Sequence, residues 1–342
     1  MKKIFLSFAV LAASLLTSCN DKIDTATPNL PDSVAGSVVN VSFTSEDAET
    51  RTFFATTSTA ETWEKSLSSV VMYVFDSEGD IITQRNFSST ELTGAMATFA
   101  IPGVESGDQC RFYVVANDST IGYVEDESML LAKVESSAAV YNGTFAEVNS
   151  AAKRSGGFLM SGSSTKSIAT GTTDVEVTLK RNVAKVAVQV AKSSTFTSLY
   201  SGDLKINSIT VSKAASQSYV FAQSSPSTGS MVYSHSQSSN VSGSYFQNLF
   251  YLFENGALAE ASRVTLTINA TYDVDGNFTT TTDQASMTYT LTLDGTSGGA
   301  ITRNGYYRIS VNINGLSGAD ATLEVTVADW ETVATQTVNL GA

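Results

Sequence analysis

Residues that commonly carry catalysis or form disulfides are scarce in this chain. Its 342 residues include one histidine, two cysteines and four prolines. The histidine, His235, lies in a serine-rich stretch, and no Gly-x-Ser-x-Gly elbow surrounds any serine, so we expect no catalytic triad and no enzyme activity. Cys19 lies at the end of an N-terminal leader, which leaves Cys110 without a partner for an intramolecular disulfide. Stability must therefore come from apolar burial and from strand pairing.

Charged residues are also few, and acidic residues outnumber basic ones. Charged residues make up 15% of the chain, with 33 Asp and Glu against 20 Lys and Arg, for a formal net charge of −13. Such a surface repels phosphates, which argues against a nucleic-acid partner. Serine, threonine and glycine are abundant instead, a composition typical of a secreted all-β protein with many turns.

The N-terminus has the pattern of a bacterial lipoprotein signal. Two lysines precede an apolar run at residues 4–16 that is too short to span a bilayer, and residues 16–19 (LTSC) form a lipobox. Cleavage before Cys19 would make it the new N-terminus, and several acyl chains such as palmitate on that residue would anchor the protein firmly. We therefore expect residues 1–18 to be a signal peptide and the mature precursor to lie outside the cytoplasm.

A tether and a short alternating segment follow the leader. Residues 20–37 show no periodicity and read as a flexible tether. Between residues 38 and 44 the side chains alternate, which places Val39, Val41 and Phe43 on one face. A period of two predicts a half-buried β-strand.

A candidate protease site comes directly after this segment. The polar, acidic run at residues 45–49 precedes Arg51, a lone basic residue in what should be a loop. An arginine-specific protease could cut there, between Arg51 and Thr52, and release the strand. The alternative is an ordinary first strand followed by an ordinary loop.

The rest of the chain is a series of short β-like segments. Strands are expected at residues 66–75, 81–82, 97–101, 109–116, 174–179, 183–190, 204–211, 219–221, 245–254, 263–272, 287–293, 305–313 and 322–327. Residues 125–148 suggest short helical pieces, and residues 224–244 a serine-rich loop. A basic break at residues 180–182 separates two alternating strands and predicts a domain boundary there. We expect an all-β protein of two transthyretin-like β-sandwich domains in tandem, residues 52–181 and 182–342.

Two motifs could bind a ligand, but each has a simpler interpretation. The run DVDGN at residues 273–277 has calcium-like carboxylates but lacks the downstream glutamate of an EF-hand loop. It is interpreted as a hairpin turn, so no metal site is expected. The aromatic run at residues 245–253 could be a sugar-binding platform, yet a core strand accounts for it better. No cofactor is expected either.

Several segments together resemble one known family. They are the lipobox at Cys19, the strand that ends before Arg51, and residues 70–79 (VVMYVFDSEG), 113–117 (YVVAN), 158–162 (FLMSG), 177–188 (VTLKRNVAKVAV), 301–315 (ITRNGYYRISVNING) and 325–330 (VTVADW). In this order and spacing the chain resembles the type V pilins of the Bacteroidales, the fimbrillin lipoprotein precursors of the FimA/Mfa type.

The resemblance implies a structural subunit of a cell-surface fimbria that supports adhesion. The lipidated precursor would reach the outer membrane, and an arginine-specific protease would cut after Arg51. Residues 19–51, tether and first strand, would leave as a propeptide. A C-terminal strand of another fimbrial subunit, identical or different, would then fill the open groove. The resemblance leaves open whether the subunit belongs to the shaft, tip or anchor, and what surface it adheres to.

Two C-terminal segments could serve as the donor strand. Residues 322–327 alternate cleanly but look necessary in the C-terminal sheet. We therefore favour the tail, in which Ala334, Val338 and Leu340 share one face with Gln336. The alternative function is a non-polymerising surface lipoprotein that binds glycans.

Overall fold

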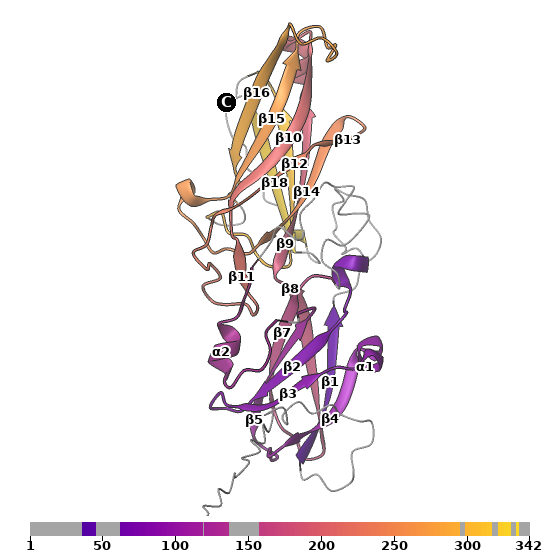
Figure 1. The fold of residues 1–342 in the computed structure, drawn as a ribbon, viewed down its shortest axis with the longest axis vertical. Helices are drawn as coiled ribbons and strands as arrows, with labels where there is room; N and C mark the ends of the chain where they lie inside the picture. The colour runs from indigo at the N-terminus through magenta and orange to yellow at the C-terminus, as the bar shows by residue number, and fades with distance from the viewer. Residues whose placement is uncertain are drawn as a thin grey trace, which may run out of the picture.

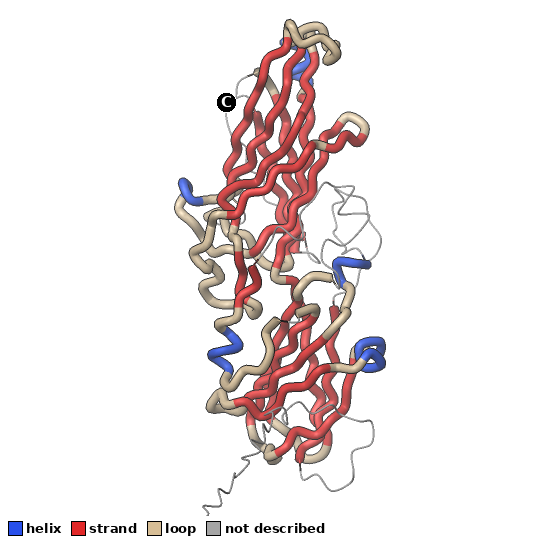
Figure 2. The backbone as a smooth tube through the Cα atoms, in the orientation of Figure 1, coloured by secondary structure: helices blue, strands red, loops and turns tan. Residues whose placement is uncertain are grey.

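The computed structural model describes residues 36–45, 62–118, 120–136, 157–294, 298–316, 321–329 and 333–334. These residues form an elongated molecule built of strands, with only short helices (Figures 1 and 2). The all-β prediction is thus confirmed. Two groups of sheets follow one another along the long axis, and each group consists of two layers that enclose apolar side chains.

The first group, here called the first sandwich, contains seven strands. Their order is β3-β2-β5-β7-β8-β1-β4. The strands are β1 (Gly36–Ser45), β2 (Val70–Phe75), β3 (Ile81–Asn86), β4 (Met96–Pro102), β5 (Gln109–Ala116), β7 (Met160–Ser167) and β8 (Thr172–Arg181). β7 and β8 share only two residue pairs, Met160↔Arg181 and Ser161↔Lys180. Beyond these two pairs, the strands β8, β1 and β4 form a layer that faces the other strands. The inward side chains of β1, β2, β4, β5 and β8 form one apolar cluster between the two layers.

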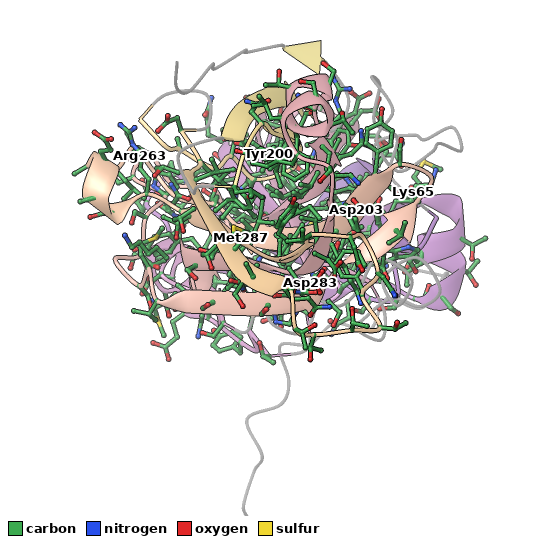
Figure 3. All side chains as sticks on the ribbon, turned by 90° about the horizontal axis from the view of Figure 1, so that it is seen from above. Lys65, Tyr200, Asp203, Arg263, Asp283 and Met287 are labelled. Carbon is green, nitrogen blue, oxygen red and sulfur yellow. The ribbon has the colours of Figure 1, made fainter. Side chains whose placement is uncertain are left out.

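The second group, the second sandwich, has a four-stranded sheet, β12-β10-β15-β16, and a six-stranded sheet, β13-β14-β9-β17-β18-β19. The strands are β9 (Val183–Lys192), β10 (Asp203–Ala214), β12 (Tyr233–Ser238), β13 (Asn240–Ser242), β14 (Tyr245–Phe253), β15 (Thr265–Asp273), β16 (Gln284–Thr292), β17 (Gly305–Ile313), β18 (Ala321–Asp329) and β19 (Val333–Ala334). Side chains from both sheets make a second apolar cluster. Figure 3, seen from above, labels Tyr200 and Met287, two partly buried side chains that pack against this cluster.

The helices are short, and all but η1 lie at the surface. They are α1 (Ser89–Gly94), α2 (Glu127–Leu131), α4 (Ser194–Leu199) and the 3-10 turns η1 (Thr62–Lys65) and η3 (Glu260–Ser262). α1 begins with a capping box, in which the Ser88 side chain accepts a bond from the Glu91 backbone and the Glu91 side chain accepts one from the Ser88 backbone. None of the described helices has the length and apolar character needed to cross a membrane.

A small ribbon connects the two sandwiches. β6 (Val134–Ser136) and β11 (Gln217–Tyr219) pair in antiparallel fashion, although they lie far apart in the chain. Directly after β11, Val220 and Phe221 are buried against the outer face of β2 and β5, in one cluster with Leu130 of α2. The second half of the chain therefore covers one face of the first sandwich.

Two expectations about local structure are wrong. Residues 233–238, assigned to a serine-rich loop, form β12 at the edge of its sheet. The period of two was hidden because the side chains on its inner face include His235 and Gln237, and Gln237 donates to the Leu249 carbonyl at 2.7 Å. The basic break at 180–182 is shorter than expected, because β8 continues through Arg181, which is only 2% exposed.

Candidate functional site: the groove filled by β1

β1 lies in the middle of a layer although it is the first described strand of the chain. It is antiparallel to β4, from Gly36↔Pro102 to Ser42↔Met96. On its other edge it is parallel to β8, from Val38↔Thr172 to Ser45↔Leu179. Removing β1 would leave β4 and β8 with facing, unpaired backbone edges, which are a template for another strand.

The inward side chains of β1 are part of the first sandwich's core. Val39 and Val41 are fully buried and Phe43 is 1% exposed. The backbone N–H of Phe43 donates to the Ala95 carbonyl at 3.1 Å, just after α1. Full burial of such a side chain contributes about 1.5–3 kcal/mol, so the three together contribute about 5–9 kcal/mol. Whole domains are stable by about 5–15 kcal/mol, so β1 accounts for a large share of what holds this sandwich together.

The outward face of β1 is polar and makes few contacts. Asn40 Nδ2 donates to Asp174 Oδ1 of β8 at 3.1 Å, and Thr98 Oγ1 of β4 donates to Asn40 Oδ1 at the same distance. These exposed hydrogen bonds align the three strands but add little free energy. The apolar inner face is therefore what any replacement strand would have to reproduce.

Most of the other residues singled out from the sequence lie outside the described residues. This holds for Cys19, Arg51 and Thr52, and for Val338 and Leu340 of the tail. Ala334 belongs to β19, the edge strand, whose backbone pairs with β18 through Val327↔Ala334 and Ala328↔Val333. The structure thus places Val39, Val41 and Phe43 in the core, on a strand paired with β4 and β8, while the excision of that strand, the protease site and the donor tail stay predictions.

A buried polar cluster lies around η1, between the two sandwiches. Glu64, in η1, is fully buried, and its Oε1 lies 2.7 Å from Lys185 Nζ of β9. Arg181 Nε donates to the Glu64 backbone carbonyl at 2.7 Å, and Tyr251 Oη donates to Glu64 Oε1 at 2.5 Å. The neighbouring Trp63 ring lies 5.2 Å from that of Phe158. η1 is held at the joint by contacts independent of β1.

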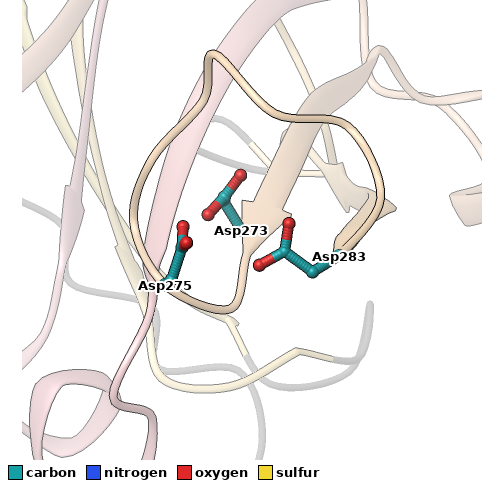
Figure 4. A group of neighbouring side chains, drawn as sticks. All are labelled: Asp273, Asp275 and Asp283. Atoms are coloured by element: carbon teal, nitrogen blue, oxygen red, sulfur yellow. The ribbon is translucent and has the colours of Figure 1, made fainter.

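Three carboxylates meet in the connection between β15 and β16 (Figure 4). Oxygens of Asp273, Asp275 and Asp283 all lie within 4.8 Å of one another. Burial raises the pKa of Asp273, but hydrogen bonds from Gln284, Asp275 and the backbone outweigh it and lower the pKa below its usual value. A hydrogen bond from the Asn277 backbone N–H lowers the pKa of Asp275. The hydrogen bond with Asp273, burial, and the charges of Asp283 and Asp273 outweigh it, so the pKa of Asp275 is raised above its usual value.

This acidic loop has a structural explanation. The Asn277 N–H donates to Asp273 Oδ1 at 2.9 Å and to Asp275 Oδ1 at 2.8 Å, and Gln284 Nε2 donates to Asp273 Oδ2 at 3.0 Å. β15 and β16 are antiparallel, so the loop is a hairpin connection, as predicted, although longer than a tight turn. Asp283 could not be assigned to this group from the sequence, because that residue lies at the far end of the loop.

The aromatic run and the histidine are both parts of the packing. Residues 248–253 of β14 are buried, which confirms the core strand and excludes an exposed aromatic platform there. The His235 ring stacks on Tyr233 with centroids 6.2 Å apart and meets Phe250 edge-on at 6.4 Å.

Comparisons with known proteins agree with this architecture. The chain matches solved structures of a fimbrilin (FimA) from Porphyromonas gingivalis W83, with 16% identity, a TM-score of 0.57, and coverage of 88% of this chain and 100% of that chain. The tip fimbrial protein Mfa3 from Porphyromonas gingivalis, with C-terminal truncation, matches with 16% identity and a TM-score of 0.55 over 86% and 100%. A fimbrial assembly protein from Parabacteroides distasonis ATCC 8503 matches with 16% identity and a TM-score of 0.50 over 89% and 100%.

At these identities the similarity establishes a shared fold. No curated protein matches the chain at a significant level. The family model described as fimbrillin-A associated anchor proteins Mfa1 and Mfa2 matches residues 32–335. Because this match spans nearly the whole chain, the protein belongs to the Mfa2 family of fimbrillin-A associated anchor proteins.

Proposed function

We propose that this protein is a structural subunit of a cell-surface fimbria that polymerises by donor-strand exchange. The precursor is lipidated on Cys19 and carried to the outer membrane. An arginine-specific protease then cuts between Arg51 and Thr52, and residues 19–51 leave with β1. The neighbouring subunit, of the same or another kind, inserts its C-terminal strand between β4 and β8.

The place of β1 in the fold supports this proposal most directly. It precedes the proposed cut, contributes Val39, Val41 and Phe43 to the core, and is paired on both edges. A strand at the edge of a sheet could leave without opening the core. A strand in the middle leaves a groove that only another strand with an apolar face can fill.

The C-terminal tail is the better donor candidate. β18 pairs along its whole length with β17, so its release would disrupt the second sandwich. β19 pairs with β18 through only two residues and is therefore easily detached. Ala334, Val338 and Leu340 would supply the apolar face. Because β19 belongs to the second sandwich and the proposed groove to the first, the contact would be head-to-tail and would extend into a filament.

The cluster around η1 supports an intact subunit after trimming. Residues 52–181 and 182–342 are the two proposed domains, and Glu64, which follows the cut, pairs with Lys185 across the boundary. The start of the mature chain would thus remain fixed while β1 is exchanged, and a fibre could transmit tension through this joint.

Trimming of the purified precursor by trypsin tests the proposal. The expected product is a fragment that begins at Thr52 and assembles into an SDS-resistant ladder. Arg51→Ala should prevent both the cut and the ladder. Arg51→Lys is the matched control: trypsin should still produce the ladder, whereas an arginine-specific protease should not.

Two results would contradict the proposal. One is a clipped protein that stays monomeric under these conditions, the behaviour expected of a glycan-binding lipoprotein that does not polymerise. The other is a ladder that forms equally well when Val338→Asp and Leu340→Asp are introduced, because the tail would then not be the donor.

A further inference from the structure

A cavity of about 330 Å³ lies beside the joint, on the outer side of the first sandwich. Its walls come from β5, β7 and β8, the end of α2, the segment that follows β11, and the loop before β17. The residues used below are Tyr113, Ser163, Thr178, Lys180, Phe221 and Arg303. The volume falls in the range of small-molecule sites and would hold one or two sugar residues.

The cavity exists because β7 and β8 diverge. The two strands pair only at Met160↔Arg181 and Ser161↔Lys180. Just beyond, at Gly162, a Cβ atom would lie 2.1 Å from the Thr178 carbonyl oxygen, so only glycine permits this close crossing. The backbone geometry at this crossing therefore contributes to the shape of the hollow.

One wall is aromatic and held in place. The rings of Tyr113 and Phe221 lie 4.9 Å apart and nearly perpendicular, at 85°. Tyr113 Oη donates to Glu127 Oε1 at 2.6 Å, which fixes the ring. Aromatic surface of this kind packs against the apolar C–H face of a pyranose ring.

The opposite side carries a buried cation with a donor left over. Arg303 is 7% exposed, forms an ion pair with Glu254, and donates to the carbonyls of Val220 at 3.0 Å and Tyr219 at 2.8 Å. Its Nε–H is buried and has no acceptor among the described residues. A buried guanidinium donor without a partner is costly and favours an acceptor supplied from outside.

Lys180 supplies a net positive charge at the same cavity. Arg303 is neutralised by Glu254, whereas Lys180 is exposed and takes part in none of the ion pairs found among the described residues. No acidic residue lines the cavity, although the chain as a whole carries −13. The cavity therefore favours an anion where most of the surface repels one.

We propose that this cavity binds a carboxylated sugar residue of a polysaccharide or glycan. The half-buried Tyr113 ring, packed against the buried Phe221 ring, would receive one face of the sugar. Ser163 and Thr178 would exchange hydrogen bonds with its hydroxyls. Lys180 and the free Nε–H of Arg303 would bind its carboxylate. The binding surface would be carried by the subunit itself and does not depend on how subunits join.

Binding of monosaccharides to the full-length protein tests this site. The probes are the methyl glycosides of N-acetylneuraminic acid, which caps animal glycans, and of glucuronic and galacturonic acid, which occur in bacterial and plant polysaccharides. Methyl galactoside is the neutral probe. We expect saturable binding of at least one acidic probe by NMR or calorimetry. The acidic sugar that binds most tightly identifies whether the natural ligand is an animal glycan or a bacterial or plant polysaccharide. The neutral sugar should bind at least about tenfold more weakly, the loss expected for one charge-assisted contact.

Variants of Lys180 separate this site from general charge attraction. Lys180→Met should weaken acidic-sugar binding about tenfold, and Lys180→Arg should largely preserve it. Lys205→Met is the matched control, because Lys205 is also an exposed lysine but lies on β10 of the second sandwich. Absence of binding by every acidic probe, equal binding of acidic and neutral sugars, or equal losses in the Lys180→Met and Lys205→Met variants would overturn the proposal.

Discussion

The ring of Phe43 meets the ring of Phe87 edge to face, with centroids 5.2 Å apart and an interplanar angle of 89°. Phe43 lies near the end of β1, and Phe87 directly follows β3 in the opposite layer. The guanidinium carbon of Arg85 lies 5.1 Å from the Phe87 centroid on the same ring. β1 is thus joined to the facing layer by a specific ring contact in addition to ordinary apolar burial.

Phe43→Ala should therefore destabilise the precursor strongly. Removing a buried phenylalanine leaves a cavity and costs about 3–5 kcal/mol. Urea unfolding of the untrimmed chain measures this loss. Ser42→Ala, on the solvent side of the same strand, is the control and should change stability by less than about 0.5 kcal/mol. Equal effects of the two substitutions would show that β1 is not held by its inner face.

The strand itself could be predicted from the sequence, but its neighbours could not. Alternation of Val39, Val41 and Phe43 with polar residues is a local signal, and β1 is found where it predicts a strand. Pairing with β8 joins Val41 to Val175, far away in the chain. Such a contact depends on the energy of the whole fold, which no local period reveals.

The buried polar cluster at the joint had no signal in the sequence. Glu64 lies in a short polar segment of the sequence. Arg181 belongs to the predicted basic break, and Lys185 to the predicted strand at residues 183–190. All three are buried, at 0%, 2% and 8% exposure. Charged residues are rarely buried unless paired, so their placement became predictable only once the segments that pair them were known.

Glu64→Ala should destabilise the protein by about 3–5 kcal/mol, because it leaves Lys185 buried without its counter-charge. The loss should be the same in the precursor and in the trimmed form, since the cluster does not contact β1. Chemical denaturation of both forms measures it.

The double variant Glu64→Gln with Lys185→Met should be more stable than Glu64→Ala alone. It removes both charges, and glutamine can still accept the hydrogen bond from Tyr251. Buried ion pairs replaced as a pair often cost little. If the losses of the single variants Glu64→Gln and Lys185→Met add up to the loss of the double variant, Glu64 and Lys185 do not interact.

Stability should fall at acidic pH in part because of Glu91. Burial raises the pKa of this carboxyl, but bonds from Arg85 and Ser88 outweigh it and hold the pKa below its ordinary value of 4.5. When folding lowers the pKa of a carboxyl, its charged form stabilises the folded state at pH values above the pKa in the unfolded chain. This stabilisation is lost as the pH falls through the pKa in the folded protein. The melting temperature should therefore drop below about pH 5, and less steeply in Glu91→Gln. Parallel pH profiles of the two proteins would contradict this role.

Cys110 offers a direct report on the departure of β1. It is 1% exposed and lies in the same apolar cluster as Val39, Val41 and Phe43. Burial, reinforced by the charges of Asp108 and Asp76, raises the pKa of the thiol to about 11. At pH 8 only about one thiol in a thousand would then be ionised, and reagents could reach it only when the core opens.

In a Cys19→Ser chain, in which Cys110 is the sole thiol, maleimide should therefore react slowly with the precursor. Trimming after Arg51 in dilute monomer should accelerate labelling at least about tenfold, because removing β1 opens the core in which the thiol lies. A peptide of residues 332–342 should restore protection by filling the groove, and the same peptide with Val338→Asp and Leu340→Asp should not. Labelling that is unchanged by trimming would mean that the core stays closed without β1, and that no groove for a donor strand is formed.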